Sequence, residues 1–421
     1  MTPEIKQRIE QIRRGEVPEG YVKKRKVVIP QQWGLPQIKD IASISSGSTP
    51  NRNNSEYWNG NIAWVTTGEL SSGHVNHTSE LITVKAVKET KMRIYPQGTL
   101  LIAMYGQGKT RGTVAILEID AAVNQACAAI TVKDGKSKFL FYQLKNSYQD
   151  IRKLSNTGNQ ENLNADIIKT YQVPWAPDEE QERISTILTT QDKVIKLKEK
   201  RLAEKQRQKK YLMQQLLTGK KRLPGFSEEW KKVKIGSFIK EIDERSTVNN
   251  QHEILSVTKN GMVFQSSHFN KQIASENNVG YKVVRRGNLA FSTMNLWMGS
   301  LDTLRICDTG IVSPAYKVFE FNQSLIVVNF AENYMKSAEM IWLYKANSEQ
   351  GASIVRRNLD LQALLNSEVA LPDISEQTAI AEVLSAADHE IDLLRQDIEQ
   401  EKQKKKALMQ LLLTGIVRVT I

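Results

Sequence analysis

An internal repeat constrains the fold of this chain more than any other feature of its sequence. The 40 residues from Glu180 to Gly219 match those from Glu376 to Gly415 without a gap, and 16 of the 40 positions are identical. The two copies lie 196 residues apart, far more than the period of roughly 20–50 residues in a solenoid protein. The repeat therefore indicates a duplicated domain and favours a pseudo-twofold molecule.

The length of the chain also indicates several domains. A prior of roughly 100–200 residues per domain allows about two to four modules in 421 residues, and the duplication favours two large ones. The predicted division is an N-terminal helical arm at 1–30, a globular module at 31–176, a long helix at 177–218, a second globular module at 219–370 and a second long helix at 371–421.

The globular modules read as mixed and mostly β. Short runs rich in β-formers, separated by Gly, Asn and Ser, occupy residues 62–67, 99–105, 113–119 and 128–132. The second module opens with the same spacing of large apolar residues as the first, although the two modules differ over most of their length. We therefore expect two unlike modules of the α+β class built on one plan.

Each module leads into a predicted helix of about 40 residues, which at 1.5 Å per residue is about 60 Å long. Apolar residues step by four and three along both helices, the spacing of a coiled-coil seam, and Gly219 and Gly415 end them. An antiparallel intramolecular coiled coil is favoured, because a whole module must fit between the helices. The alternative is that each helix packs only on its own module, but a small module cannot bury so long a stripe. The predicted seam residues are Ile184, Leu188, Ile195, Leu202, Leu212 and Leu216 in the first helix and Ile380, Leu384, Ile391, Ile398, Leu408 and Leu412 in the second.

The charge and the cysteines narrow the classes of function. A formal net charge of +12 suggests a polyanionic partner such as nucleic acid, although charged runs are also common as solvated faces. The sequence has neither a long uncharged apolar run nor a signal-peptide core, which predicts a cytoplasmic protein with no membrane role. Cys127 and Cys307 lie far apart, so they predict neither a disulfide framework nor a metal site.

One segment imitates a nucleotide-binding loop. Residues 103–110 read Ala-Met-Tyr-Gly-Gln-Gly-Lys-Thr after an apparent strand. A phosphate-binding loop needs a helix that starts at its Lys-Thr pair, whereas residues 111–116 continue as β-forming sequence. We therefore predict that this segment does not bind ATP.

The same segment is better interpreted as a hairpin loop that enters a DNA groove. Glycines flank Gln107, Lys109 and Arg111 between two predicted strands. Lys and Arg can bond guanine edges and Gln can bond adenine, each good pair discriminating by about 1–3 kcal/mol. The alternative is an exposed turn with ordinary solvated charges.

Other side chains of the same types extend the list of candidate DNA contacts, although any one of them can equally be a structural surface residue. Paired arginines favour phosphate contacts, because most protein–DNA hydrogen bonds go to the backbone. The further candidates are Arg93, Gln125 and Gln160 in the first module and Arg285, Arg286, Asn295, Trp297, Arg356 and Arg357 in the second.

No catalytic motif stands out in the sequence. It contains no Asn/Asp-Pro-Pro-aromatic motif for amino methylation, no nucleophile elbow and no helicase motif set. The acidic run Asp178-Glu179-Glu180 lies at a predicted helix start, where the helix dipole accounts for it. These observations favour a DNA-reading protein that is not itself an enzyme. The rival hypotheses are a single-chain DNA-modifying enzyme with an unrecognised site and a coiled-coil adaptor without a DNA role.

Several of these features together resemble the DNA-specificity subunit of type I restriction-modification enzymes, over essentially the whole chain. The residues that carry the resemblance are the Pro-led helix entries with Glu-Gln at 177–181 and 372–377, the Leu-Leu-Thr-Gly endings at 216–219 and 412–415, and the Leu-Pro-Gly-Phe linker at 223–226 that runs to Trp230.

The resemblance implies two target-recognition domains that each read half of a split DNA sequence, held apart by a coiled coil whose length sets the spacing. It implies docking of two modification subunits, which methylate adenine at N6, and of motor-nuclease subunits, as part of a defence against foreign DNA. S-adenosylmethionine, ATP and magnesium are expected on these partners, with no cofactor on this chain. The N-terminal arm is expected to complete the pseudo-symmetry beside the second helix.

Overall fold

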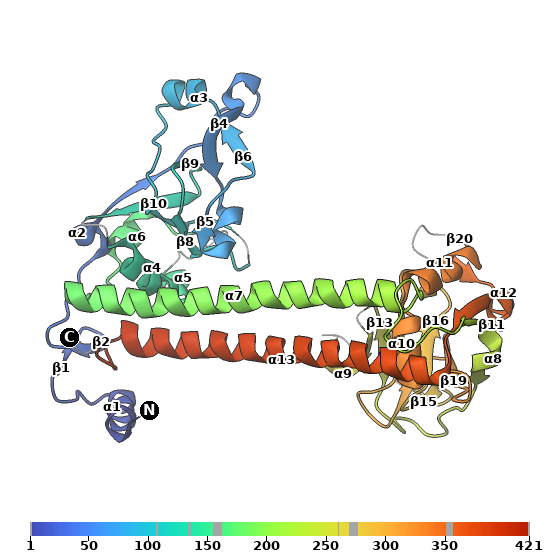
Figure 1. The fold of residues 1–421 in the computed structure, drawn as a ribbon. Helices are drawn as coiled ribbons and strands as arrows, with labels where there is room; N and C mark the ends of the chain where they lie inside the picture. Colours follow the sequence, from blue (N-terminus) through green and yellow to red (C-terminus); the bar gives the residue numbers. More distant parts are fainter. Residues whose placement is uncertain are drawn as a thin grey trace. The chain divides into compact units, whose positions relative to one another are not determined.

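The computed structural model describes residues 2–106, 108–133, 136–154, 162–259, 261–268, 277–350 and 357–419. The chain forms two compact units (Figure 1). The first comprises Met1–Lys198 with Asp397–Ile421, and the second comprises Glu199–Gln396. Each unit therefore holds one globular head and one part of each long helix.

The N-terminal arm of the first unit contains one helix and one hairpin. Helix α1 (Pro3–Arg13) starts at Thr2, whose hydroxyl accepts a hydrogen bond from the Ile5 amide. Strands β1 (Tyr21–Lys24) and β2 (Val27–Pro30) pair antiparallel. Tyr21 Oη donates to the Gly415 carbonyl at 2.7 Å, so the arm is attached to the end of the second long helix.

Head 1 is built on two sheets (Figure 1). The larger sheet has the strand order β3 (Ala42–Ser46), β10 (Cys127–Val132), β7 (Leu100–Ala103), β8 (Val114–Leu117) and β5 (His74–Val75). The smaller has the order β6 (Glu80–Ile82), β4 (Trp58–Val65) and β9 (Ala121–Val123). The helical segments are α2 (Ile38–Ile41), η1 (Ser55–Tyr57), η2 (Thr67–Ser72), α3 (Val84–Glu89), α4 (Ser137–Asn146), α5 (Tyr148–Lys153) and α6 (Ala165–Thr170).

Head 2 repeats this plan with different details. Its four-stranded sheet has the order β12 (Ile239–Ile242), β19 (Tyr316–Phe321), β16 (Leu289–Ser292) and β17 (Leu301–Thr303). Four two-stranded pairs surround it, β11 (Lys231–Lys234) with β22 (Glu368–Leu371), β13 (Leu255–Thr258) with β14 (Gly261–Phe264), β15 (Lys282–Arg285) with β18 (Thr309–Val312), and β20 (Ser348–Gln350) with β21 (Arg357–Leu359). Its helical segments are α8 (Ile235–Phe238), α9 (Gln265–His268), η4 (Leu296–Met298), α10 (Val328–Tyr334), α11 (Ala338–Ala346) and α12 (Leu361–Asn366). The prediction of two mixed, mostly β modules is confirmed.

The two long helices are α7 (Asp178–Leu216) and α13 (Ile374–Leu413), and they pack antiparallel within each unit, as predicted. In the first unit Asp192 of α7 pairs with Lys405 of α13, and in the second Lys209 of α7 pairs with Asp388 of α13 at 2.6 Å. These two pairs are the same pair of repeat positions with the helices exchanged, since 388 is 192 plus 196 and 405 is 209 plus 196.

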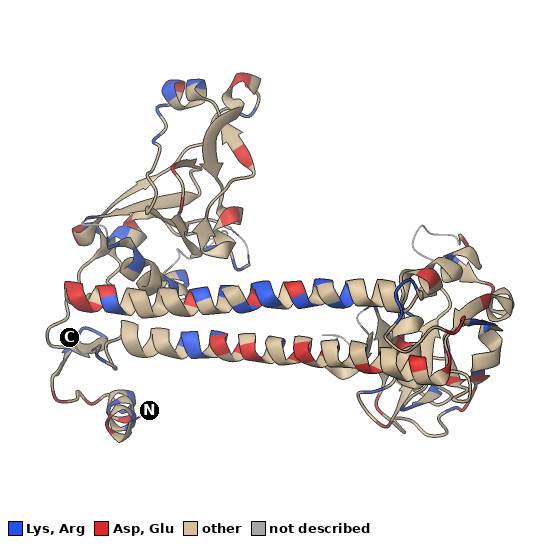
Figure 2. Ribbon diagram, in the orientation of Figure 1, with Lys and Arg blue, Asp and Glu red and all other residues tan. Residues whose placement is uncertain are grey.

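The predicted seam residues lie on the faces by which these helices pack. All twelve are buried or half-buried, and Ile184, Leu188 and Leu384 are among those almost without exposure. Ile184 and Leu188 share one buried cluster with Phe139 and Leu140 of α4, so the core of head 1 continues onto the helices. Charged residues of both signs alternate along the rest of α7 (Figure 2). Among the described residues, no helix combines the length and the apolar character that a membrane crossing requires.

The glycines that end both long helices allow close contacts that a side chain would block. Gly219 and Gly415 have φ of +64° and +73°, a left-handed conformation suited to glycine. A Cβ at Gly415 would lie 2.5 Å from Cδ of Pro30. The first head therefore begins directly against the end of α13.

Candidate nucleic-acid interface

The loop between β7 and β8 in head 1 is a hairpin loop, as predicted. The two strands pair antiparallel, and the Gly112 amide donates to the Ala103 carbonyl at 2.8 Å. Gly106, Gly108 and Gly112 all have positive φ, so the loop turns at its glycines. The strand β8 follows the Lys-Thr pair where a nucleotide-binding loop requires a helix, which supports the rejection of ATP binding here.

Helix α5 holds the backbone of this loop in place. Tyr148 Oη donates to the Lys109 carbonyl at 2.7 Å, and Arg152 Nη1 donates to the Arg111 carbonyl at 2.7 Å. The Arg152 guanidinium also lies over the Tyr148 ring, 5.3 Å from its centroid. The Lys109 side chain is exposed. The loop thus presents a cation to solvent on a fixed backbone.

Sequence reasoning missed Tyr148 and Arg152. They are four residues apart on one helix, which places them on the same face. No local pattern indicates which loop that face meets, because the hydrogen bonds join residues about 40 positions apart in the chain.

Arg111 lies differently from the expectation. Its side chain is only 7% exposed, whereas an exposed loop cation was predicted. The chain turns inward at Gly112, where a Cβ would lie 3.0 Å from the Arg152 side chain, and Arg111 is packed with that turn. Gln107 and Gln160 lie outside the described residues.

The remaining candidates of head 1 are exposed but belong to other segments. The guanidinium of Arg93 lies 5.4 Å from the centroid of the Tyr95 ring. Gln125 follows β9, and its Oε1 accepts a hydrogen bond from Thr49 Oγ1. Both side chains are available at the surface, but neither belongs to the β7–β8 loop.

In head 2 the structure brings three predicted residues together. Asn295 precedes the short helix η4, which contains Trp297 and lies in the loop between β16 and β17. The Arg357 guanidinium lies 6.0 Å from the centroid of the Trp297 ring, and the Arg357 amide donates to the Met294 carbonyl at 3.3 Å. Arg357 Nε also donates to Ser348 Oγ at 2.9 Å. Arg356 lies outside the described residues.

The loops of the two heads are topologically equivalent. The strand order β3-β10-β7-β8 in head 1 corresponds to β12-β19-β16-β17 in head 2, so the β7–β8 and β16–β17 loops join equivalent strands. Both also pack on a helix, α5 in head 1 and α11 in head 2. Equivalent loops therefore carry unlike side chains, a lysine in one head and an Asn, Trp and Arg group in the other.

Arg285 and Arg286 are occupied by acidic neighbours. Arg285 pairs with Glu244 at 2.6 Å, and Arg286 pairs with Asp308 at 2.8 Å. The hydrogen bond from Glu244 raises the pKa of Arg285. Both arginines stay more than half exposed, so contact with a phosphate requires exchange of a carboxylate partner.

The described residues offer little apparatus for catalysis. They contain no group of three or more His, Cys, Asp or Glu side chains placed to hold a metal ion. Burial raises the pKa of the Cys127 thiol to about 12, so this thiol stays protonated and is a poor nucleophile at neutral pH. His74 Nδ1 lies 2.8 Å from Glu118 in an exposed pair.

A buried carboxylate marks the start of each long helix. Glu180 and Glu376 are each 1% exposed. Trp33 Nε1 donates to Glu180 at 2.9 Å, and Arg418 donates to both of its oxygens. Trp230 and Arg222 bind Glu376 in the same way, the arginine at 2.6 Å to each oxygen.

These two clusters correct the assignment of Glu180 to the helix dipole alone. The carboxylate joins the helix start to the head and to the segment that follows the other long helix. Arg222 and Arg418 also lie 196 residues apart, three positions beyond the repeated glycines. Extending the comparison of the repeats by three residues would have revealed the arginines.

Comparisons with known proteins agree with this architecture. A family model described as the type I restriction modification DNA specificity domain matches the chain twice, at residues 30–206 and 227–403. The MjaIX type I restriction enzyme specificity subunit of Methanocaldococcus jannaschii is 34% identical over 178 residues, which are 41% of this chain and 40% of that protein. The MjaVIII specificity subunit of the same organism is 24% identical over 424 residues, 93% of this chain and 94% of that protein.

Solved structures show the same fold. A chain from a study of complex assembly and conformational transition of the type I R-M system has a TM-score of 0.58 at 14% identity, covering 92% of this chain and 99% of that chain. The type I restriction-modification S subunit from M. genitalium has a TM-score of 0.52 at 12% identity, covering 95% and 99%. With the family domain present twice, the chain belongs to the specificity subunits of type I restriction-modification enzymes, which are non-catalytic subunits.

Proposed function

We propose that each head reads one half of a bipartite DNA sequence. The observation that carries this proposal is the pair of equivalent loops with unlike side chains, β7–β8 with Lys109 and β16–β17 with Asn295 and Trp297. A lysine can bond guanine in the major groove, whereas an asparagine can bond adenine through two hydrogen bonds. Two unlike loops on one plan are suited to two unlike half-sites.

Most of the affinity for DNA is expected to come from phosphate contacts. The chain carries a formal net charge of +12, and cations that neutralise phosphates release condensed counterions. Arg93 in head 1 and Arg285 and Arg286 in head 2 are exposed cations suited to this role. Gln107, Gln125, Gln160, Arg356 and Arg357 remain candidate contacts on the same reasoning.

The long helices are proposed to set the spacing between the half-sites and to dock the catalytic partners. These partners are two modification subunits, which bind S-adenosylmethionine and methylate adenine at N6, and motor-nuclease subunits, which use ATP and magnesium. The repeated pairs Asp192–Lys405 and Lys209–Asp388 support an equivalent docking place on each repeat. The complex would act on DNA in the cytoplasm.

A module exchange tests the division of labour between the heads. Residues 31–176 are replaced by the corresponding module of another specificity subunit, and the assembled complex is tested by mapping methylated adenines in genomic DNA. We expect one half of the recognised sequence to change and the other half to persist. An unchanged recognition sequence would exclude head 1 as a reader.

A further inference from the structure

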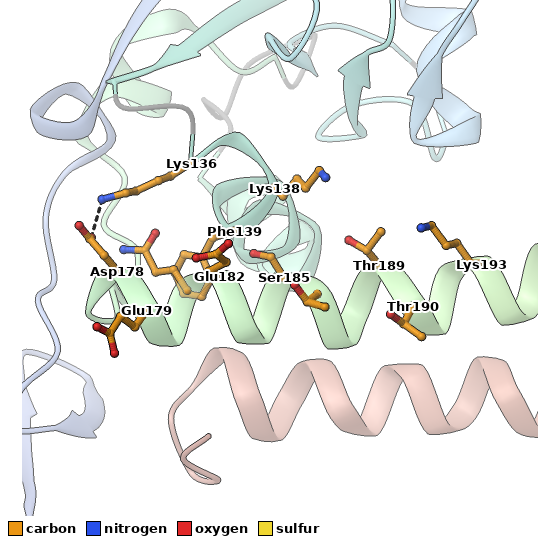
Figure 3. A pocket seen from close by; sticks show the side chains of 12 residues that line it. Lys136, Lys138, Phe139, Asp178, Glu179, Glu182, Ser185, Thr189, Thr190 and Lys193 are labelled. Carbon is orange, nitrogen blue, oxygen red and sulfur yellow. Dashed lines mark ion pairs between the residues drawn. The ribbon is translucent and has the colours of Figure 1, made fainter. Parts of the chain in front are cut away.

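A groove of about 610 Å³ lies in the first unit, between α4 and the first turns of α7 (Figure 3). Acidic side chains line the end near the start of α7, and lysines extend beyond hydroxyl groups at the other end. The residues used below are Asp178, Glu182, Gln181, Thr186, Lys138 and Lys193, all of which line it.

The floor of this groove contains an unsatisfied amide oxygen. Gln181 is 2% exposed, and its Nε2 donates to the Ala176 carbonyl at 2.7 Å. Its Oε1 is buried and has no hydrogen-bond partner. A buried acceptor of this kind is unfavourable unless a donor reaches it.

The second repeat contains a complete version of this arrangement. Gln377 is the equivalent of Gln181, and its Nε2 donates to the Pro372 carbonyl just as Gln181 donates to Ala176. The Gln377 amide also binds a passing backbone segment of head 2, because Nε2 donates to the Leu325 carbonyl at 2.9 Å and Oε1 accepts from the Val327 amide at 2.8 Å. One glutamine thus recognises a carbonyl and an N–H two residues apart.

We propose that the groove beside Gln181 binds an extended acidic segment of a partner protein in the place that residues 325–327 take beside Gln377. A backbone N–H of that segment donates to Gln181 Oε1, and its carboxylates face Lys138 and Lys193. The proposal rests on the proposed function, since the partner belongs to the assembled restriction-modification complex. Each chain has one such site, because its own backbone fills the equivalent place in the second repeat.

The groove suits a protein segment better than a nucleic acid. Asp178 and Glu182 line its acidic end and would repel phosphates there. The unsatisfied Oε1 requires a donor, which every backbone N–H of an extended peptide other than proline can supply. The two lysines are described without an ion pair to another side chain, so acidic side chains of the segment complement them.

A photocrosslinking experiment tests this proposal in the full complex. A benzophenone amino acid replaces Thr186, an exposed residue of the groove, and the chain is assembled with its modification and motor-nuclease subunits on DNA. We expect a crosslink to an acidic stretch of one partner subunit, identified by mass spectrometry. The paired changes Lys138→Glu and Lys193→Glu should reduce its yield roughly tenfold through charge repulsion.

A matched control separates the groove from the general charge of the helix. Lys196→Glu with Lys200→Glu changes the same net charge at exposed positions of α7 outside the groove, and this pair should leave the crosslink intact. A crosslink to DNA, to this chain alone or to no partner would overturn the proposal, and so would equal loss in both variants. Sequence-specific methylation by the same complex reports separately on the proposed function, because it can persist when the groove proposal fails.

Discussion

At the scale of single residues, Lys109 and Arg111 have different roles although they are two positions apart. Lys109 is exposed on a loop whose carbonyl is held by Tyr148, whereas Arg111 is 7% exposed. The glycine turns of the loop decide which of the two side chains faces solvent. A basic residue in a glycine-rich hairpin is therefore not sufficient to define a DNA contact.

Replacing Lys109 should weaken DNA binding without destabilising the protein. Lys109→Ala removes one exposed cation, so the slope of log affinity against log salt should decrease by about one. Binding of the assembled complex to DNA is titrated at several salt concentrations. Lys109→Arg, which retains the charge, should preserve the slope, and wild-type behaviour of the Ala variant would exclude a phosphate contact.

Arg111→Ala should instead act mainly on stability. The side chain is packed beneath the loop, and its loss should lower the free energy of unfolding by about 1–3 kcal/mol. Denaturant unfolding followed by circular dichroism measures this loss. A stable Arg111→Ala variant with a reduced salt slope would show that the buried arginine moves out to meet DNA.

The carboxylate Glu376 should contribute more to stability than other acids on α13. Glu376→Gln leaves the Arg222 guanidinium without its bidentate partner in a largely buried place, which should cost roughly 3 kcal/mol. The matched control Glu382→Gln changes an exposed acid on the same helix and should alter stability by less than about 0.5 kcal/mol. Equal effects in denaturant unfolding would contradict a role for the buried cluster.

At the scale of elements, the helix pair is held in register by charges that repeat. Asp192 with Lys405 and Lys209 with Asp388 are equivalent positions exchanged between the two helices. Other polar contacts occur only once, such as Gln191 Nε2 donating to Glu401 at 2.6 Å and Lys198 pairing with Glu401 at 2.9 Å. The seam therefore combines a symmetric set of contacts with an asymmetric set.

A charge exchange tests the symmetric set. Lys209→Asp or Asp388→Lys alone places like charges opposite each other and should destabilise the second unit, whereas the double exchange should recover most of the loss. The expected coupling is about 1 kcal/mol, because Asp388 is 48% exposed. A double-mutant cycle by denaturant unfolding gives this coupling energy, and strict additivity would rule out the pair as a register contact.

The asymmetric set predicts a pH dependence. Hydrogen bonds from Lys198 and then Gln191 lower the pKa of Glu401 from 4.5 to about 2. A carboxyl whose pKa is lower in the folded state stabilises that state above its ordinary pKa. This contribution should be lost as the pH falls from about 4.5 to about 2. Thermal melting across that range measures it, and Glu401→Gln should flatten this part of the profile.

At the scale of the whole molecule, the function depends on two heads joined by one helix pair. The chain leaves one compact unit and enters the other between Lys198 and Glu199 in α7 and between Gln396 and Asp397 in α13. The helix contacts described above lie within one unit or the other. Added helix at these two points would therefore preserve the contacts of both units.

A paired insertion tests the proposed spacing role. One heptad added after Lys198 and one after Gln396 lengthens both helices by about 10 Å at 1.5 Å per residue and keeps the seam in phase. This length corresponds to about three base pairs at 3.4 Å each. Methylation mapping should show unchanged half-sites with a spacer longer by about three base pairs. An unchanged spacer would show that the helices do not set it.

The sequence by itself determined the duplication, the two long helices, their antiparallel pairing and the family. These features depend on residue periodicity and on identities at a constant offset, which are visible along the chain. It did not predict the burial of Arg111 or the contact of Arg357 with Trp297. It also missed the joining of Trp33, Glu180 and Arg418, which lie up to 385 positions apart in the chain (418 minus 33). Only the tertiary structure decided these contacts, because packing between distant segments leaves no pattern in the local sequence.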